Sequence, residues 1–128
     1  MKAVLIMGST SDESHAKKIT NKLDDYGIAW EQHAASAHKQ PLKVLEILET
    51  KKKEKDIVYI TIAGRSNALS GFVAANSEFP TLACPPFVNK TDMLVNIHST
   101  LQMPSNVPVL TIIDPENCAM AVKRIFGV

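Results

Sequence analysis

The sequence has few cysteines, few aromatic residues and almost no net charge. Its two cysteines, Cys84 and Cys118, lie far apart and form neither a C-x-x-C pair nor a Cys/His ligand spacing. We therefore expect two buried, reduced thiols rather than a disulfide or metal ligands. A balance of 14 basic against 13 acidic residues excludes a general electrostatic attraction to nucleic acid or to an anionic membrane. Any bound anion must be held by local geometry.

Long hydrophobic runs are also absent. Only five apolar residues, 3–7, precede Gly8, which is too few for the core of a signal peptide. No stretch approaches the roughly 20 apolar residues of a membrane span. We expect a cytoplasmic protein without a membrane partner. The length of 128 residues fits one domain, residues 1–128, because domains usually contain about 100 to 150 residues.

Short β-rich runs alternate with longer segments of helical period along the whole chain. The predicted strands cover residues 3–7, 28–34, 57–62, 81–84 and 107–113. The first predicted helix is capped by Ser11 and ends at Gly27, and the second begins at Pro41. The third follows residue 67, Met93, Leu94, Ile97 and Leu101 mark the fourth, and the fifth begins after Asp114. The apolar residues expected to face inward include Leu45 in the second helix and Cys118, Ala119, Val122 and Ile125 in the fifth.

Five strand–helix units argue for an open parallel sheet with helices on both faces. We predict an α/β fold, a three-layer α/β/α sandwich around about five parallel strands in the flavodoxin-like order 2-1-3-4-5. Strand 28–34 is the least apolar, so we place it at an edge. In such sheets, ligands bind outside the carboxyl ends of the strands, near the point where strand order reverses. The loops after the first three strands are therefore the candidate site.

The first of these loops is Gly8-Ser9-Thr10-Ser11-Asp12. Gly8 lets a ligand approach the backbone, and the free amides at a helix start together with three hydroxyls suit a phosphate. Asp12 would repel phosphate but could accept hydrogen bonds from ribose hydroxyls. Plain helix capping explains the same residues about equally well.

The second and third loops add a histidine, a lysine and an arginine. Ser36-Ala37-His38-Lys39 supplies an imidazole able to move protons near neutral pH, and Ala63-Gly64-Arg65-Ser66-Asn67 supplies amides and a guanidinium. The other three histidines are interpreted as surface or structural residues: His15, His33 and His98. The residues alone indicate a small anionic ligand carrying phosphate and ribose, with acid–base work by His38.

At these same loops the chain resembles a known family over essentially its whole length. The three loops, together with Cys84-Pro85-Pro86 and Met103-Pro104-Ser105, are similar in order and spacing to those of the 5-aminoimidazole ribonucleotide (AIR) carboxylases of purine biosynthesis, called PurE. Class I members move a carboxyl group from the exocyclic nitrogen to the ring carbon, and class II members carboxylate AIR directly with CO2. Class I has a histidine where this chain has Ala68 and an arginine where it has Lys39. The chain therefore resembles class II.

The resemblance implies roles for particular residues. His38 would remove the proton from the carboxylated ring carbon, and Ser36 would position substrate and histidine. Asp12 would bind the ribose hydroxyls, and Lys39 and Arg65 would neutralise the phosphate or the new carboxylate. The full substrate-binding set comprises Gly8, Ser9, Ser11, Asp12, Ser36, Lys39, Gly64, Arg65, Ser66 and Asn67.

The resemblance also implies partners. It implies neither a metal nor a cofactor, and CO2 as the co-substrate. It also implies a homo-oligomer, which in the family is usually an octamer. Family members usually continue past the position of Val128 with a C-terminal helix that packs on neighbouring subunits. Asn106 stands where the family commonly has glycine, and asparagine tolerates the left-handed conformation.

Three alternatives stay open at this point. One is a class I mutase acting on N-carboxyaminoimidazole ribonucleotide. Another is a non-catalytic nucleotide- or flavin-binding module, because flavodoxin-like sheets carry FMN at the same edge, although the three loops contain no aromatic ring. The third is an inactive relative that binds purine intermediates.

Overall fold

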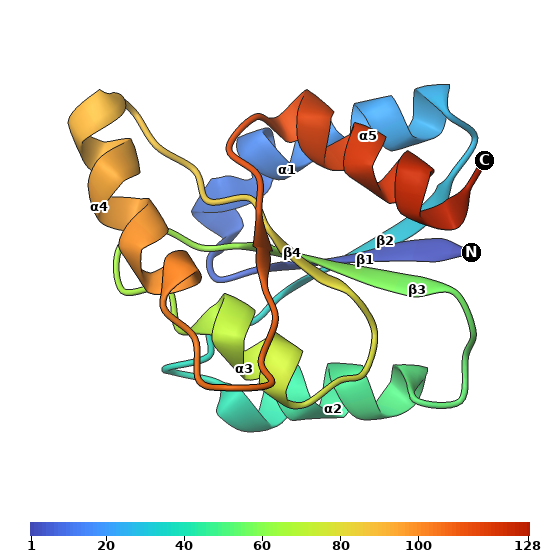
Figure 1. Ribbon diagram of the computed structural model, residues 1–128, viewed down its shortest axis with the longest axis horizontal. Coiled ribbons are helices and arrows are strands. Elements are labelled where there is room, and N and C mark those ends of the chain that lie inside the picture. Colours follow the sequence, from blue (N-terminus) through green and yellow to red (C-terminus); the bar gives the residue numbers. More distant parts are fainter.

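A five-stranded parallel sheet in the order β2-β1-β3-β4-β5 forms the centre of the computed structural model (Figure 1). Its strands are β1 (Lys2–Met7), β2 (Ala29–Ala34), β3 (Ile57–Ile62), β4 (Thr81–Ala83) and β5 (Leu110–Thr111). Every neighbouring pair is parallel. The predicted α/β fold, the strand order and the edge position of β2 are confirmed.

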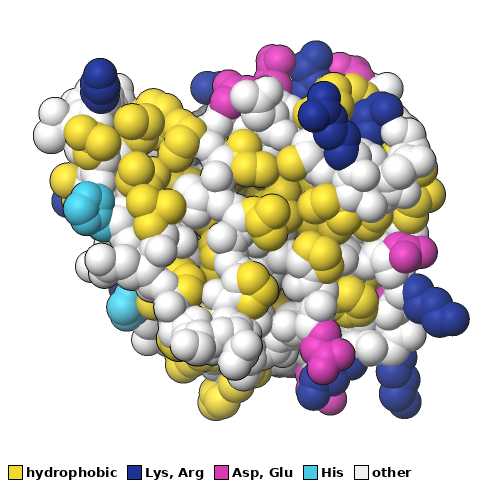
Figure 2. All heavy atoms as spheres, viewed as in Figure 1, with side chains coloured by type: hydrophobic (Ala, Val, Ile, Leu, Met, Phe, Trp, Pro, Cys, Tyr) yellow, Lys and Arg dark blue, Asp and Glu magenta, His cyan; other side chains and the backbone are white.

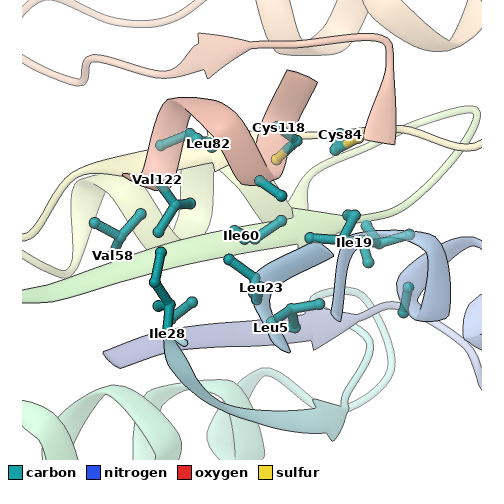
Figure 3. Packing of buried hydrophobic residues seen from close by; sticks show 14 of the residues in the cluster. Leu5, Ile19, Leu23, Ile28, Val58, Ile60, Leu82, Cys84, Cys118 and Val122 are labelled. Atoms are coloured by element: carbon teal, nitrogen blue, oxygen red, sulfur yellow. The ribbon is translucent and has the colours of Figure 1, made fainter. Parts of the chain in front are cut away.

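Alternate residues of the central strands supply two separate cores, because successive side chains point to opposite faces of a sheet. Leu5 and Ile60 face α1 (Glu13–Asp25) and α5 (Pro115–Phe126), which lie together on one side of the sheet (Figures 1 and 3). Val4 and Tyr59 face α2 (Pro41–Lys51) and α3 (Leu69–Ala75) on the other side. The layers are therefore helices, sheet and helices, as predicted.

The fourth helix, α4 (Lys90–Leu101), covers neither face of the sheet. It stands beyond the carboxyl ends of the strands, at the left of Figure 1. The residues it buries are polar, Asn96 and Thr100, whereas Leu94 and Leu101 are 49% and 62% exposed. The sequence marked this helix correctly by its apolar residues. Its inner side meets the polar loops at the strand ends instead of a hydrophobic face.

The helix ends follow the sequence signals with one exception. Gly27 ends α1 with a positive φ of 69°, Pro41 opens α2, and the Asp114 side chain accepts a hydrogen bond from the backbone N–H of Asn117 at 2.9 Å. Ser11 is not a cap. The Ser9 hydroxyl accepts the Ser11 N–H instead, over a short 3-10 turn of residues Thr10–Asp12.

Three predictions about packing at the periphery are wrong. The predicted strand 107–113 shrinks to β5, because Pro108 has no N–H to give to a ladder and β4 offers only Leu82 and Ala83 as partners. Leu45 and Ile125 were expected to face inward but are exposed at the rims of α2 and α5. Ile47 takes the inward position in α2.

Both cysteines are buried and free, as predicted. Asn106 has a φ of 67°, the left-handed conformation that asparagine tolerates. None of the helices has both the length and the apolar content needed to cross a bilayer.

Glu31 joins the edge strand β2 to its neighbours. Its Oε1 accepts hydrogen bonds from Lys2 on β1 at 3.1 Å and from Lys51 at the end of α2 at 2.6 Å, and its Oε2 lies 2.6 Å from Nε2 of His33. Burial alone would raise the pKa of this carboxyl group. The hydrogen bonds from Lys51, His33 and Lys2 outweigh burial and lower the pKa of Glu31 to about 2.

Replacing Glu31 by glutamine should therefore destabilise the protein in a pH-dependent way. Because the folded pKa lies below the ordinary value of 4.5, the carboxylate stabilises the fold fully above pH 4.5, and this contribution is lost as the pH falls towards 2. At pH 7, Glu31→Gln should lose about 1 kcal/mol of unfolding free energy in urea titrations, since the network is only partly exposed. The difference from wild type should shrink between pH 4.5 and 2. Glu49→Gln removes an exposed pair with Lys52 and should change little, so equal losses in both variants would contradict the prediction.

Candidate active site

The loops after β1 and β3 lie side by side because their strands are paired in register from Lys2 and Ile57 to Met7 and Ile62. The N–H of Gly8 donates to the Ile62 carbonyl at 2.9 Å. A Cβ at position 8 would lie 3.3 Å from the Cβ of Ala63, closer than most side-chain contacts. Gly8 thus allows the two loops to approach each other, which is a different role from the ligand approach predicted for it.

A cleft of about 560 Å³ opens between α1, the loop after β3 and α4. This volume suits a small metabolite. Most of the residues in its walls are polar, and Pro86, Phe87 and Val88 form an apolar part. The walls consist of Ser9, Ser11, Asp12, Ser14, His15, Lys18, Gly64, Arg65, Pro86, Phe87, Val88, Asp92 and Asn96. The cleft lies at the carboxyl ends of the strands, where the sequence placed the site.

The charges around the cleft are mixed. His15, Lys18 and Arg65 offer positive or proton-carrying groups, and Asp12 and Asp92 supply carboxylates. Burial raises the pKa of Asp12, and the neighbouring His15 only partly offsets this effect. Such a site can hold an anion on its cationic side and hydroxyl groups on the carboxylate.

His15 connects the cleft to the buried cysteines. Its Nε2 lies 3.0 Å from the Cys84 carbonyl oxygen and 3.5 Å from the Cys84 Sγ. Because a carbonyl oxygen only accepts, Nε2 carries a proton. Hydrogen bonding with Cys118 and with His15 lowers the pKa of Cys84 to about 6 against the effect of burial, while the bond to Cys84 and burial raise the pKa of Cys118. The sequence interpretation of His15 as a surface or structural residue missed its place in the cleft wall.

His38 lies outside this cleft, in an adjoining hollow with Ser66, Asn67 and Met103. The imidazole is exposed, and its Nε2 lies 3.0 Å from the Ser66 carbonyl oxygen. Nε2 therefore carries the proton, and Nδ1 keeps the free lone pair of a neutral ring. The loop after β3 is thus shared between the cleft and the histidine.

The rest of the second loop is organised by Ser36. Its hydroxyl accepts the backbone N–H of Lys39 at 3.2 Å, and its carbonyl accepts the N–H of Gln40 at 2.7 Å. These bonds form a turn that presents His38 at the carboxyl edge of β2. Ser36 and Lys39 line neither the cleft nor the hollow.

The third loop turns sharply at Arg65, which has a φ of 54°. Asn67 is almost fully buried, and its Oδ1 accepts the N–H of Ser70 at 3.3 Å, so it holds the start of α3 rather than facing the cleft. Gly64 and Arg65 do line the cleft.

The structure thus gathers five of the eleven predicted site residues in one cleft. Ser9, Ser11, Asp12, Gly64 and Arg65 line it. His38, Ser66 and Asn67 border the adjoining hollow, and Gly8, Ser36 and Lys39 border neither. His33 is a structural residue bonded to Glu31, and His98 is exposed on α4.

Sequence reasoning missed Lys18, the Pro86–Val88 wall and Asn96, in addition to His15. His15 and Asp12 are three positions apart, a spacing that places two residues on one side of a helix, and this signal could have found the histidine. Asn96 has no local signal, because it meets the loops only through the tertiary position of α4. The structure contains no group of three or more His, Cys, Asp or Glu side chains arranged to hold a metal ion.

Fold and site together define a class of protein. The chain is a flavodoxin-like α/β protein with a polar cleft for a small, anionic ligand at the switch point of its sheet, bordered by an exposed histidine.

Comparison with known sequences narrows this class to a family. The model of the AIR carboxylase family matches residues 2–128, and the chain belongs to that family. It is 51% identical over 127 residues to the phosphoribosylaminoimidazole carboxylase of Archaeoglobus fulgidus, covering 99% of this chain and 69% of that protein. Identity to the enzyme of the same name from Treponema denticola is 41% over 125 residues, covering 97% and 78%.

Solved structures agree with this assignment. The crystal structure of Treponema denticola PurE superposes with a TM-score of 0.91 at 40% identity, covering 98% of this chain and 80% of that one. The resemblance to the AIR carboxylase family, stated from the loop motifs, is confirmed.

The raised pKa of Asp12 leads to a prediction about stability. Because the folded pKa lies above the ordinary 3.8, the carboxylate is disfavoured in the folded state at neutral pH, and this cost disappears below pH 3.8. Asp12→Asn should therefore raise the unfolding free energy at pH 7 by roughly 0.5 kcal/mol in urea titrations, with no gain at pH 3. Asp25→Asn, at an exposed position at the end of α1, should show no such gain. Destabilisation by Asp12→Asn at pH 7 would contradict the prediction.

Proposed function

We propose that this protein carboxylates AIR with CO2 to 4-carboxy-5-aminoimidazole ribonucleotide in purine biosynthesis, in a reversible reaction. The observation that carries the proposal is the coincidence of the AIR carboxylase family match with a polar cleft and an exposed histidine at one sheet edge. Phosphoribosylaminoimidazole carboxylase is also the name of the relatives in Archaeoglobus and Treponema.

The chemistry requires a base for one proton. The electron-rich ring carbon of AIR attacks CO2, a carbon–carbon bond forms, and that ring carbon becomes tetrahedral, bearing both hydrogen and carboxylate. Loss of the proton restores aromaticity. His38 takes it on Nδ1, because Nε2 is committed to the Ser66 carbonyl. In the reverse direction, the same nitrogen returns the proton and CO2 leaves.

The remaining site residues hold the substrate. Asp12 binds the ribose hydroxyls, and Ser9, Gly64 and Ser66 hold the phosphate and its neighbouring atoms. The guanidinium of Arg65 and the ammonium of Lys39 balance the phosphate and the new carboxylate. Ser36 sets the turn that presents His38, since its hydroxyl accepts the Lys39 N–H. Neither metal nor cofactor takes part in this scheme, because so reactive a ring carbon needs no activation of CO2.

Two positions, Ala68 and Lys39, favour direct carboxylation over the class I rearrangement. Class I members carry a second histidine where this chain has Ala68, and an arginine where it has Lys39. Ala68 stands at the start of α3 and offers no group for a second proton transfer. A cytoplasmic location stays a prediction.

Self-association completes the proposal. The Leu94, Val95 and Leu101 side chains of α4 are exposed, and hydrophobic side chains gather over this helix at the left of Figure 2. Exposed apolar patches of this kind mark interfaces. The cleft and the exposed His38 also lack a lid within the chain. In a homo-oligomer, expected to be the octamer of the family, a neighbouring subunit covers the cleft and His38.

The histidine assignment is tested by His38→Asn. Asparagine keeps a polar side chain of similar reach but cannot accept and return a proton, so kcat should fall by about 10²- to 10⁴-fold. AIR affinity by calorimetry should stay close to wild type. His98→Asn, at an exposed histidine away from the loops, serves as the control. Unchanged turnover in His38→Asn would show that the histidine assignment is wrong.

Substrate choice separates the two classes. Purified wild type should consume AIR with bicarbonate as a CO2 source, followed by the ultraviolet absorbance of the product. Product from N-carboxyaminoimidazole ribonucleotide alone would overturn the class II proposal. Binding of AIR without turnover of either compound would leave a binding protein and overturn the enzyme proposal.

The interface is tested by Leu94→Glu with Leu101→Glu. Two carboxylates on the exposed side of α4 should oppose burial there and reduce the mass measured by light scattering after size exclusion to that of one chain. Leu42→Glu, an exposed leucine on α2, is the matched control and should keep the wild-type mass. A monomeric wild type would contradict self-association itself.

A further inference from the structure

The loop that carries Arg65 holds a strained backbone. Arg65 has a φ of 54°, the left-handed region that residues other than glycine rarely adopt. Such conformations persist only where the surroundings over-determine them, and they concentrate at functional sites. The residues that hold Arg65 in this conformation therefore help to determine the shape of the cleft.

One buried side chain of α4 forms a hydrogen bond with this backbone. Asn96 is only 3% exposed, and its Oδ1 accepts the N–H of Arg65 at 2.7 Å. Its Nδ2 donates to the Pro86 carbonyl at 2.7 Å. A Cβ at Gly64 would lie 3.3 Å from this nitrogen, so the loop rests directly on the amide. The two ends of one side chain thus hold two different walls of the cleft.

Ser99, three positions further along α4, also forms hydrogen bonds with this loop. Its hydroxyl donates to the Arg65 carbonyl at 3.1 Å and accepts the N–H of Asn67 at 3.0 Å. Arg65 is therefore bonded at its N–H by Asn96 and at its carbonyl by Ser99. After this turn, the next carbonyl, that of Ser66, lies 3.0 Å from Nε2 of His38.

We infer that Asn96 and Ser99 are positioning residues for the carboxylation, and this rests on the proposed function. Neither belongs to the predicted site. Asn96 fixes the distance between the guanidinium-bearing loop and the Pro86 wall, and hence the shape of the substrate cleft. Ser99 holds the same loop in the turn that orients His38. Both act through other residues, which is why α4 buries polar rather than apolar side chains.

Asn96→Ala removes the hydrogen bonds of the amide group to Arg65, Pro86 and Asp92 and leaves room for water. In the full-length protein, the Arg65 amide should lose protection and exchange its hydrogen on the order of tenfold faster. With AIR, kcat/KM should fall on the order of tenfold to a hundredfold, because small displacements of positioning groups are costly. Most of this loss should lie in KM, since the partners of Asn96 line the cleft.

Thr100→Val is the matched control. Thr100 is equally buried on α4, but its hydroxyl bonds only within the helix, to the Ile97 carbonyl at 2.8 Å. The control should keep wild-type Arg65 exchange and wild-type kcat/KM, even if its melting temperature falls. If Asn96→Ala fails to fold, Ser99→Ala, at a less buried position, replaces it. The faster exchange is then expected at the Asn67 amide, whose N–H the Ser99 hydroxyl accepts, and the loss of activity mainly in kcat.

The outcomes separate the two proposals. Amide exchange in the ligand-free protein requires no turnover, and AIR affinity by calorimetry reports the cleft directly, so both remain decisive if wild type proves inactive. Faster Arg65 exchange with weaker AIR binding supports the inference. Exchange like that of the Thr100→Val control overturns it. So does faster exchange with unchanged AIR affinity and kcat/KM, which would make Asn96 and Ser99 structural residues only.

Discussion

The structure depends on the buried parallel pairing of β1 with β3. From Val4 to Met7 and from Ile57 to Ile62, both strands are buried, with helices over each face. Each such aliphatic side chain contributes about 1.5 to 3 kcal/mol on burial, so the register of the pair is strongly specified. That register brings Gly8 against Ala63 and sets two loops side by side at the carboxyl edge. The cleft exists because this pairing ends at the same level on both strands.

A second constraint comes from α4. On its inner side, Asn96 and Ser99 satisfy backbone groups of the loop after β3, and on its outer side Leu94 and Leu101 stay exposed. Buried backbone groups of an irregular loop need partners, and a helix with a polar inner side supplies them. The same helix thus faces both the proposed substrate and the proposed neighbouring subunit. Its apolar residues have a spacing typical of a core-facing helix, but they lie on the proposed subunit interface.

Much of the fold could be predicted because its signals are local. The unbroken apolar runs of β1 and β3, Gly27 after α1, and Asp114 with Pro115 before α5 each act within a few residues, and all are confirmed. Predictions failed where the outcome depended on a distant partner. β5 is short because β4 offers it only two residues.

The sequence by itself determined the alternation of strands and helices, the sheet order and the three loops proposed to carry the chemistry, since periodicity, caps and motifs are short-range properties. It also indicated the AIR carboxylase family through those loops, which the comparisons confirmed. Only the tertiary structure decided that His15 lines the cleft, that Asn67 is buried and that Asn96 holds Arg65. These depend on where α4 and the strand ends meet in space, and contacts between residues about 30 positions apart leave no pattern in a single sequence.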